Sequence, residues 1–153
     1  MAVKAPAATD EKLYRVALRE ALNEEMERDE NVYVIGEDIG KFGGAYRVTE
    51  GLLDRFGAQR VVDAPIAEEV IVGCAIGSAM LGLRPVVEMM TINFSLVAYD
   101  QIVNNAAKIR YMFGGEAKVP IVIRMPGGAG HQLSAQHSHS LEVLYGLIPG
   151  LLV

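Results

Sequence analysis

The sequence predicts an α/β fold, a doubly wound parallel sheet with helices on both faces, and three observations predict it. Short apolar strand patterns alternate with longer helical patterns along nearly the whole chain, as in parallel sheets joined by crossover helices. The strand patterns are continuous apolar runs, which is typical of strands buried on both faces. The 153 residues contain no internal repeat, low-complexity segment or linker, so a single domain is expected.

Hydrophobic periodicity and turn residues give the expected elements in order. Helices are expected at residues 13–26, 52–56, 67–83, 95–113 and 141–147. Strands are expected at 32–35, 61–62, 86–89, 121–123 and, where the chain enters a fifth strand, 150–153. Thr49 is expected to cap the short second helix, and Gly82 to end the third. After the second strand, Ala64-Pro65 forces an extended turn, because the residue before proline avoids the helical region.

The helix expected at 67–83 is the most unusual element of the chain. No charged residue occurs between Val70 and Leu83, which predicts burial on every side. Glycine and other small residues are frequent in it, at a cost of about 1 kcal/mol of helix propensity per glycine. We therefore expect another backbone or a subunit to pack closely against it. Cys74, the single cysteine, is interpreted as a small core residue.

Composition and charge exclude several classes of protein. The net charge is −5 and no basic run occurs, which argues against nucleic acid as a partner. The longest uncharged run, 70–83, is too short to cross a membrane. Residues 1–12 lack the apolar region of a secretory signal and are interpreted as a flexible tail before a domain at 13–153. The lone cysteine favours a reducing compartment, and the end at 150–153 suggests a truncated domain.

Polar residues follow each expected strand, where open α/β sheets bind their ligands. Glu37 and Asp38 follow the first strand, and Asp63 and Glu68 follow the second. The third strand is followed by Thr91, Asn93 and Phe94. The fourth is followed by the glycine loop 127–130 and then by Gln136, His137, Ser138 and His139. The sequence therefore predicts a site with two carboxylates, an aromatic ring and a histidine at one edge of the sheet.

Each of these residues also has a simpler interpretation. Glu68 is also consistent with an acid that only complements the helix dipole, and Glu37 with an ordinary loop acid. Phe94 fits a core aromatic residue. His137 and His139 fit a solvated loop or half of a metal site. The glycine loop lacks the dinucleotide and P-loop spacings, and no G-x-S-x-G motif occurs, which argues against hydride transfer, P-loop hydrolysis and serine hydrolysis.

Six ordered motifs carry a resemblance over about 13–153. They are VIGEDIG (34–40), GAYRVTEGL (44–52), DAPIAE (63–68), GLRPVVEMMTINF (82–94), DQIVNNAAK (100–108) and AQHS (135–138). Together they resemble the beta subunit of the thiamine-diphosphate-dependent component of 2-oxo acid dehydrogenase complexes, most closely the pyruvate dehydrogenase type. This family implies a pyrimidine-binding domain with the sheet described above.

The resemblance implies a role for five residues. Glu68 would hydrogen-bond ring nitrogen N1′ of the aminopyrimidine and Phe94 would stack against that ring. Glu37 would belong to a polar path between two active sites. His137 would act on the substrate and in acyl transfer. The backbone carbonyl of Ile121 would contribute to a potassium site.

The resemblance also implies partners. An alpha subunit would hold the diphosphate and Mg²⁺ through a G-D-G…N signature that this chain lacks. A second beta subunit would complete a heterotetramer, which would take a small 2-oxo acid and acylate a lipoyl-bearing dihydrolipoamide acyltransferase. The family's C-terminal domain is missing, so the chain alone is expected to be inactive. The expected location is the bacterial cytoplasm or an organelle matrix or stroma.

Two alternatives to the pyruvate dehydrogenase assignment stay open at this point. One is another thiamine enzyme with the same domain, such as a branched-chain 2-oxo acid dehydrogenase or a transketolase relative. The other is a truncated assembly module without activity.

Overall fold

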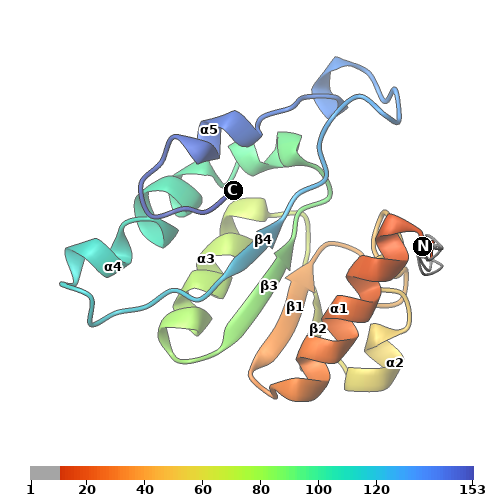
Figure 1. The fold of residues 1–153 in the computed structure, drawn as a ribbon, viewed down its shortest axis with the longest axis horizontal. Helices are drawn as coiled ribbons and strands as arrows, with labels where there is room; N and C mark the ends of the chain where they lie inside the picture. Colours follow the sequence, from red (N-terminus) through yellow and green to blue (C-terminus); the bar gives the residue numbers. More distant parts are fainter. Residues whose placement is uncertain (1–10) are drawn as a thin grey trace, which may run out of the picture.

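The structure, a computed structural model, describes residues 11–153, so the tail expected at 1–12 falls almost entirely outside the described residues. Four parallel strands form its sheet in the order β2-β1-β3-β4 (Figure 1). They are β1 (Val32–Gly36), β2 (Val61–Asp63), β3 (Arg84–Glu88) and β4 (Val122–Arg124). β2 lies on one side of β1, and β3 lies on the other side. The order in which strands are added to the sheet therefore changes direction at β1.

Helices cover both faces of this sheet, which confirms the predicted doubly wound fold (Figure 1). On one face, α1 (Tyr14–Arg28) and α2 (Leu52–Phe56) share an apolar cluster with the strands. On the other, the cluster includes residues of α3 (Glu68–Met80), the 3-10 helix η1 (Ile92–Leu96), the π-helix η2 (Gln101–Ala106) and α5 (Glu142–Gly146). The remaining elements are α4 (Ile109–Met112) and the 3-10 helix η3 (Ala135–His137).

The continuous apolar runs of the strands result from this two-sided burial. Val34 packs with the α1 cluster, whereas its neighbour Ile35 packs with the α3 cluster. Both side chains are buried although they point to opposite faces. In β3, Val87 is fully buried in the α3 cluster, and its partly buried neighbour Val86 packs against the α1 cluster. Apolar and polar residues therefore need not alternate along β1 and β3.

The prediction of one continuous helix at 95–113 is wrong. The segment is divided into η1, η2 and α4. The Ser95 hydroxyl donates to the carbonyl oxygen of Ile92, and the amide of Ala107 bonds the carbonyl of Ile102 five residues earlier. Serine that bonds backward to the main chain competes with the regular helical ladder, and an i→i+5 bond widens the turn into a π-helix.

The prediction that α3 is buried on every side is wrong. Val70 and Met80 are 60% and 42% exposed, and Cys74 and Gly77 between them are exposed as well. The sheet covers one face of α3, through buried residues such as Val72, and within residues 11–153 no second layer covers the other face. Cys74 is thus a surface thiol rather than a core residue.

Two smaller expectations also fail. The Thr49 hydroxyl donates to the carbonyl oxygen of Ile39 rather than capping α2, which begins after Gly51 in a left-handed conformation. Residues 151–153 form no strand, because Gly150 (φ +101°) turns the chain and the Leu151 amide bonds Ile148 instead. No helix within the described residues is long and apolar enough to cross a membrane.

Candidate functional site

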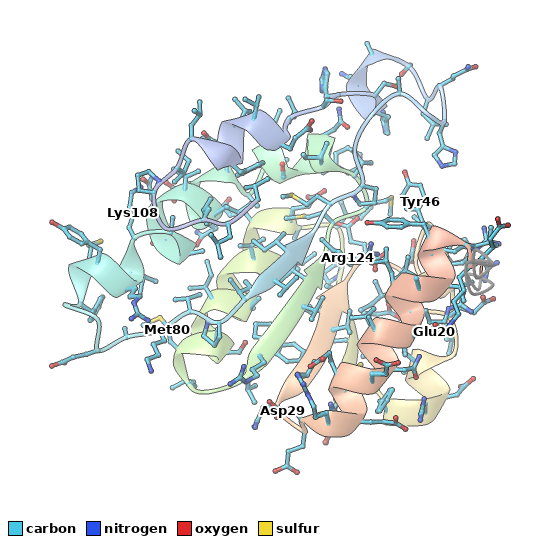
Figure 2. The ribbon with its side chains drawn as sticks, in the orientation of Figure 1. Glu20, Asp29, Tyr46, Met80, Lys108 and Arg124 are labelled. Atoms are coloured by element: carbon cyan, nitrogen blue, oxygen red, sulfur yellow. The ribbon has the colours of Figure 1, made fainter. Side chains whose placement is uncertain are left out.

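The strand register aligns the last residues of all four strands in one row. Gly36 lies opposite Asp63 on one side and Glu88 on the other, and Glu88 lies opposite Arg124. The loops that carry the predicted site residues leave from this row, as expected for an open α/β sheet. In Figure 2, Arg124 and Tyr46 mark this carboxyl edge of the sheet, and Asp29 marks the opposite edge.

Glu37 is held by the loop that follows β1. Asp38 takes a left-handed conformation (φ 54°), which aspartate tolerates better than most residues. The backbone N–H of Gly40 then donates to Oδ1 of Asp63 at 2.7 Å. A Cβ at Gly40 would lie 2.3 Å from Oδ2 of Asp63, so a larger residue here would displace the Asp63 carboxylate. This turn leaves the Glu37 side chain buried, with 7% of its surface exposed.

Glu68 occupies the first position of α3, at the end of the turn that begins with Ala64-Pro65. The amide of Ala64 donates to the carbonyl oxygen of Gly36, which fixes the start of the turn beside β1. Glu68 is 6% exposed, whereas Glu69 is exposed. Both acids are near the positive end of the helix dipole, but only Glu68 is buried. A purely dipole-complementing acid would not need burial, so Glu68 is the stronger candidate.

The two buried acids interact electrostatically. Burial is the largest cause that raises the pKa of the Glu37 carboxyl, followed by the nearby charges of Glu68 and Asp38. Oε1 of Glu37 is buried and has no hydrogen-bond partner within residues 11–153. Buried polar atoms are normally paired, so an unpaired carboxyl oxygen beside a second acid is a feature of a binding or proton-transfer site.

Phe94 and His137 form the second part of the site. The two rings lie edge to face, with centroids 5.3 Å apart and an interplanar angle of 86°. Both residues are half-buried, and they come from the segments after β3 and β4. Nδ1 of His137 is buried, and the described part of the chain offers it no hydrogen-bond partner. Phe94 is therefore not a core aromatic, and His137 is not a fully solvated loop residue.

Ile121 lies apart from these residues. It immediately precedes β4, at the amino edge of the sheet, and it lines a cavity of about 890 Å³ together with Asp29, Arg84 and Tyr145. Residues 11–153 contain no group of three or more His, Cys, Asp or Glu side chains placed to hold a metal ion. The structure thus brings Glu37 and Glu68 together, and Phe94 and His137 together, but it leaves Ile121 at the opposite edge.

A buried ion pair at the carboxyl edge was not predicted from the sequence. Glu88, 4% exposed, accepts from the Arg124 guanidinium at 2.7 Å. Glu88 also faces the loop after β1, since a Cβ at Gly44 would lie 2.8 Å from its Oε1. The signal was present, because a glutamate in the last position of a buried strand requires a partner, but its partner is 36 residues away in the chain.

Comparisons with known proteins agree with this fold. The family model described as transketolase, pyrimidine binding domain, matches residues 10–153. The chain belongs to this family. The pyrimidine-binding domain is 53% identical over 139 residues to the pyruvate dehydrogenase E1 component subunit beta of Rickettsia felis, covering 91% of this chain and 43% of the relative.

Further relatives and a solved structure extend this comparison. The chloroplastic subunit beta-4 of Oryza sativa subsp. japonica is 56% identical over 135 residues, 88% of this chain and 34% of the relative. A split gene transketolase, described as an inactive beta4 tetramer, shares the fold with a TM-score of 0.67 at 21% identity, covering 88% of this chain and 40% of that chain. The pyrimidine-binding domain thus spans less than half the length of the curated relatives that it matches.

Proposed function

We propose that this domain binds the aminopyrimidine end of thiamine diphosphate as part of a pyruvate dehydrogenase beta subunit. The assembled enzyme would decarboxylate pyruvate and pass the acetyl group to the lipoyl arm of a dihydrolipoamide acyltransferase. The observation that carries this proposal is the buried Glu68 carboxylate at the first position of α3, facing the carboxyl edge of the sheet. The high identity to subunits of that name supports the choice of pyruvate.

The residues present fit the cofactor. An aminopyrimidine needs an acid at a ring nitrogen and an apolar or aromatic surface for its face, and Glu68 and Phe94 offer these at one edge. Oε1 of Glu37, which has no partner within residues 11–153, leaves polar capacity unused at the same edge and supports the fit. When bound, thiamine diphosphate supplies an electron sink for the electrons released with CO₂.

Each residue has a defined task in this proposal. Glu68 shares a proton with N1′ and keeps the ring oriented, an interaction of about 1.5–3 kcal/mol for a hydrogen bond to a charged group. Glu37, whose pKa is raised by burial and then by Glu68, belongs to the polar path that exchanges protons with Glu68. His137, with Nδ1 unpaired among the described residues, serves the substrate and the acyl transfer as an acid or base.

The exposed face of α3 supports the proposed subunit partners. This face is formed by Val70, Cys74, Gly77 and Met80, and a Cβ at Gly77 would meet no other atom of the described residues within 4 Å. It lacks charge, and its small residues allow close approach of another helix. In the proposal, it contacts a subunit of the alpha/beta assembly, in which an alpha subunit holds the diphosphate and Mg²⁺ and a second beta subunit is present.

Other parts of the proposal concern the ion and the compartment. The carbonyl oxygen of Ile121 is proposed as one ligand of a potassium ion, at the amino edge and therefore in a structural rather than a catalytic position.

Relatives of this chain are named from a bacterium and from chloroplasts. We propose a bacterial cytoplasm or an organelle stroma or matrix, with this chain inactive when separated from the alpha subunit.

Substrate profiling tests the proposed activity. The natural polypeptide that carries this domain is co-expressed with its alpha subunit, and release of CO₂ is measured with pyruvate and with branched-chain 2-oxo acids. We expect dependence on added thiamine diphosphate and the highest kcat/KM with pyruvate. A higher kcat/KM for a branched-chain acid would contradict the assignment to pyruvate, and activity independent of thiamine diphosphate would contradict the cofactor.

A further inference from the structure

The polar side chain of Asn93 joins two loops at the carboxyl edge. Asn93 precedes Phe94 in η1 and is buried, with 8% of its surface exposed. Its side-chain carbonyl oxygen accepts from the Thr91 hydroxyl at 2.7 Å, and the backbone N–H of Asn93 donates to that same hydroxyl oxygen at 3.0 Å. These bonds fix the amide group in one orientation.

The fixed amide contacts a histidine of the other loop. With its oxygen bound by Thr91, Asn93 presents Nδ2 to Nδ1 of His139, 46 residues further along the chain. An amide nitrogen can only donate, so Nδ1 of His139 accepts and the ring carries its proton on Nε2. The contact therefore selects one tautomer and one orientation of the His139 ring.

His139 is also held through its backbone. Its carbonyl oxygen accepts from the N–H of Gly128 at 2.8 Å, in the glycine loop after β4. A parallel tie connects the same loop to η1, where the N–H of Ile92 donates to the carbonyl oxygen of Pro126 at 2.8 Å. His139 thus lies where three segments meet: η1, the glycine loop and the segment that follows η3.

These ties join the two segments that carry Phe94 and His137. Phe94 is the residue after Asn93, and His137 lies two residues before His139, so the contact between Asn93 and His139 and the edge-to-face ring pair connect the same two segments. Nδ1 of His137 has no hydrogen-bond partner within the described residues. The position of the His137 ring is therefore set by its contact with Phe94 and by the path of its loop, rather than by a bond of its own.

We propose that His139 is a positioning residue that, through Asn93, holds His137 against Phe94 in the orientation needed for acyl transfer. This inference rests on the proposed function of His137. Displacement of a reacting group by about 1 Å costs on the order of a hundredfold in rate, so loss of one tie is expected to have a measurable effect. His139 itself is exposed, and its replacement is not expected to unfold the domain.

The test compares His139→Ala, His139→Gln, His137→Ala and the double variant in the natural polypeptide assembled with its alpha subunit. Decarboxylation is measured with an artificial electron acceptor, and acetyl transfer with the lipoyl-bearing acyltransferase. His131→Ala is the matched control, a histidine of the same region whose ring lies 5.3 Å from that of Tyr46 instead.

We expect His139→Ala to slow acetyl transfer by roughly tenfold to a hundredfold with an unchanged melting temperature. His139→Gln, whose side-chain oxygen can accept from Asn93, should restore most of the rate, and His131→Ala should behave as wild type. In the His137→Ala background, His139→Ala should add no further loss, because residues that act as a unit are not additive.

The outcomes separate this inference from the proposed function. If His137→Ala slows acetyl transfer but His139→Ala does not, or if the two losses multiply, the positioning role of His139 is wrong and the role of His137 stands. If His137→Ala leaves both half-reactions unchanged, the proposed role of His137 is wrong, and the role of His139 falls with it.

Discussion

Glu37 and Glu68 are both buried at the carboxyl edge of the sheet, although one follows β1 and the other begins α3. Burial and then the charge of Glu68 raise the pKa of Glu37, and one oxygen of Glu37 lacks a partner among the described residues. A raised pKa in a buried acid that lies beside a second acid is a common property of catalytic sites. It also makes the stability of the domain depend on pH.

Glu37→Gln should change this pH dependence. The folded state binds the Glu37 proton more tightly than the unfolded chain does, because its pKa is raised on folding. The contribution of Glu37 to stability therefore falls as pH rises from the ordinary glutamate value through the raised one. We expect Glu37→Gln to raise the melting temperature by a few degrees at about pH 7 and to have little effect at about pH 4. An equal shift at both values would contradict the raised pKa.

Gly77→Ala should have opposite effects on the stability of the domain and on its assembly with the alpha subunit. Gly77 is an exposed helical residue with open space around it among the described residues, so alanine is expected to stabilise the domain by about 0.5–1 kcal/mol through helix propensity. If the exposed α3 face packs against a subunit, the added methyl group should weaken that assembly. Denaturant unfolding and analytical ultracentrifugation with the alpha subunit measure the two effects.

A matched control for Gly77→Ala is Glu24→Ala on the exposed surface of α1. It changes a helical surface residue away from α3 and should leave assembly unchanged. Normal assembly of Gly77→Ala would show that this face of α3 is not the subunit contact.

Arg124→Met should be strongly destabilising. The substitution leaves Glu88, 4% exposed, as a buried charge without its partner, and breaking a buried ion pair in this way costs about 3–5 kcal/mol. The double variant Glu88→Leu with Arg124→Met should recover most of this loss, since it removes both charges. Arg28→Met, which removes an exposed pair with Glu25 on α1, should cost about 0–1 kcal/mol. Comparable losses for Arg28→Met and Arg124→Met in urea unfolding would refute this interpretation.

The parts of the fold that depend on local pattern could be predicted from the sequence. The apolar runs of β1 and β3 indicated parallel strands buried on both faces, and the loops that follow the strands indicated where Glu37, Glu68, Phe94 and His137 lie. Their grouping at one edge follows from topology alone, because all the strands point the same way.

Other features depend on contacts that a local pattern does not contain. The exposure of α3 could not be predicted, since an uncharged helix looks the same whether the domain or another chain covers it. The pair of Glu88 with Arg124 and that of Asn93 with His139 join residues 36 and 46 positions apart. The division of residues 95–113 into short helices depends on hydrogen bonds such as that of Ser95 to Ile92, which compete with a regular ladder.

The most direct test of the account replaces Glu68 by glutamine in the natural polypeptide assembled with its alpha subunit. Glu69→Gln is the control, because it changes the adjacent acid of the same helix turn, which is exposed. Pyruvate-dependent CO₂ release is measured for both, together with the melting temperature and assembly. We expect Glu68→Gln to lower the rate by at least about a hundredfold with folding and assembly intact, and Glu69→Gln to retain it. Wild-type turnover by an assembled Glu68→Gln enzyme would contradict the central claim.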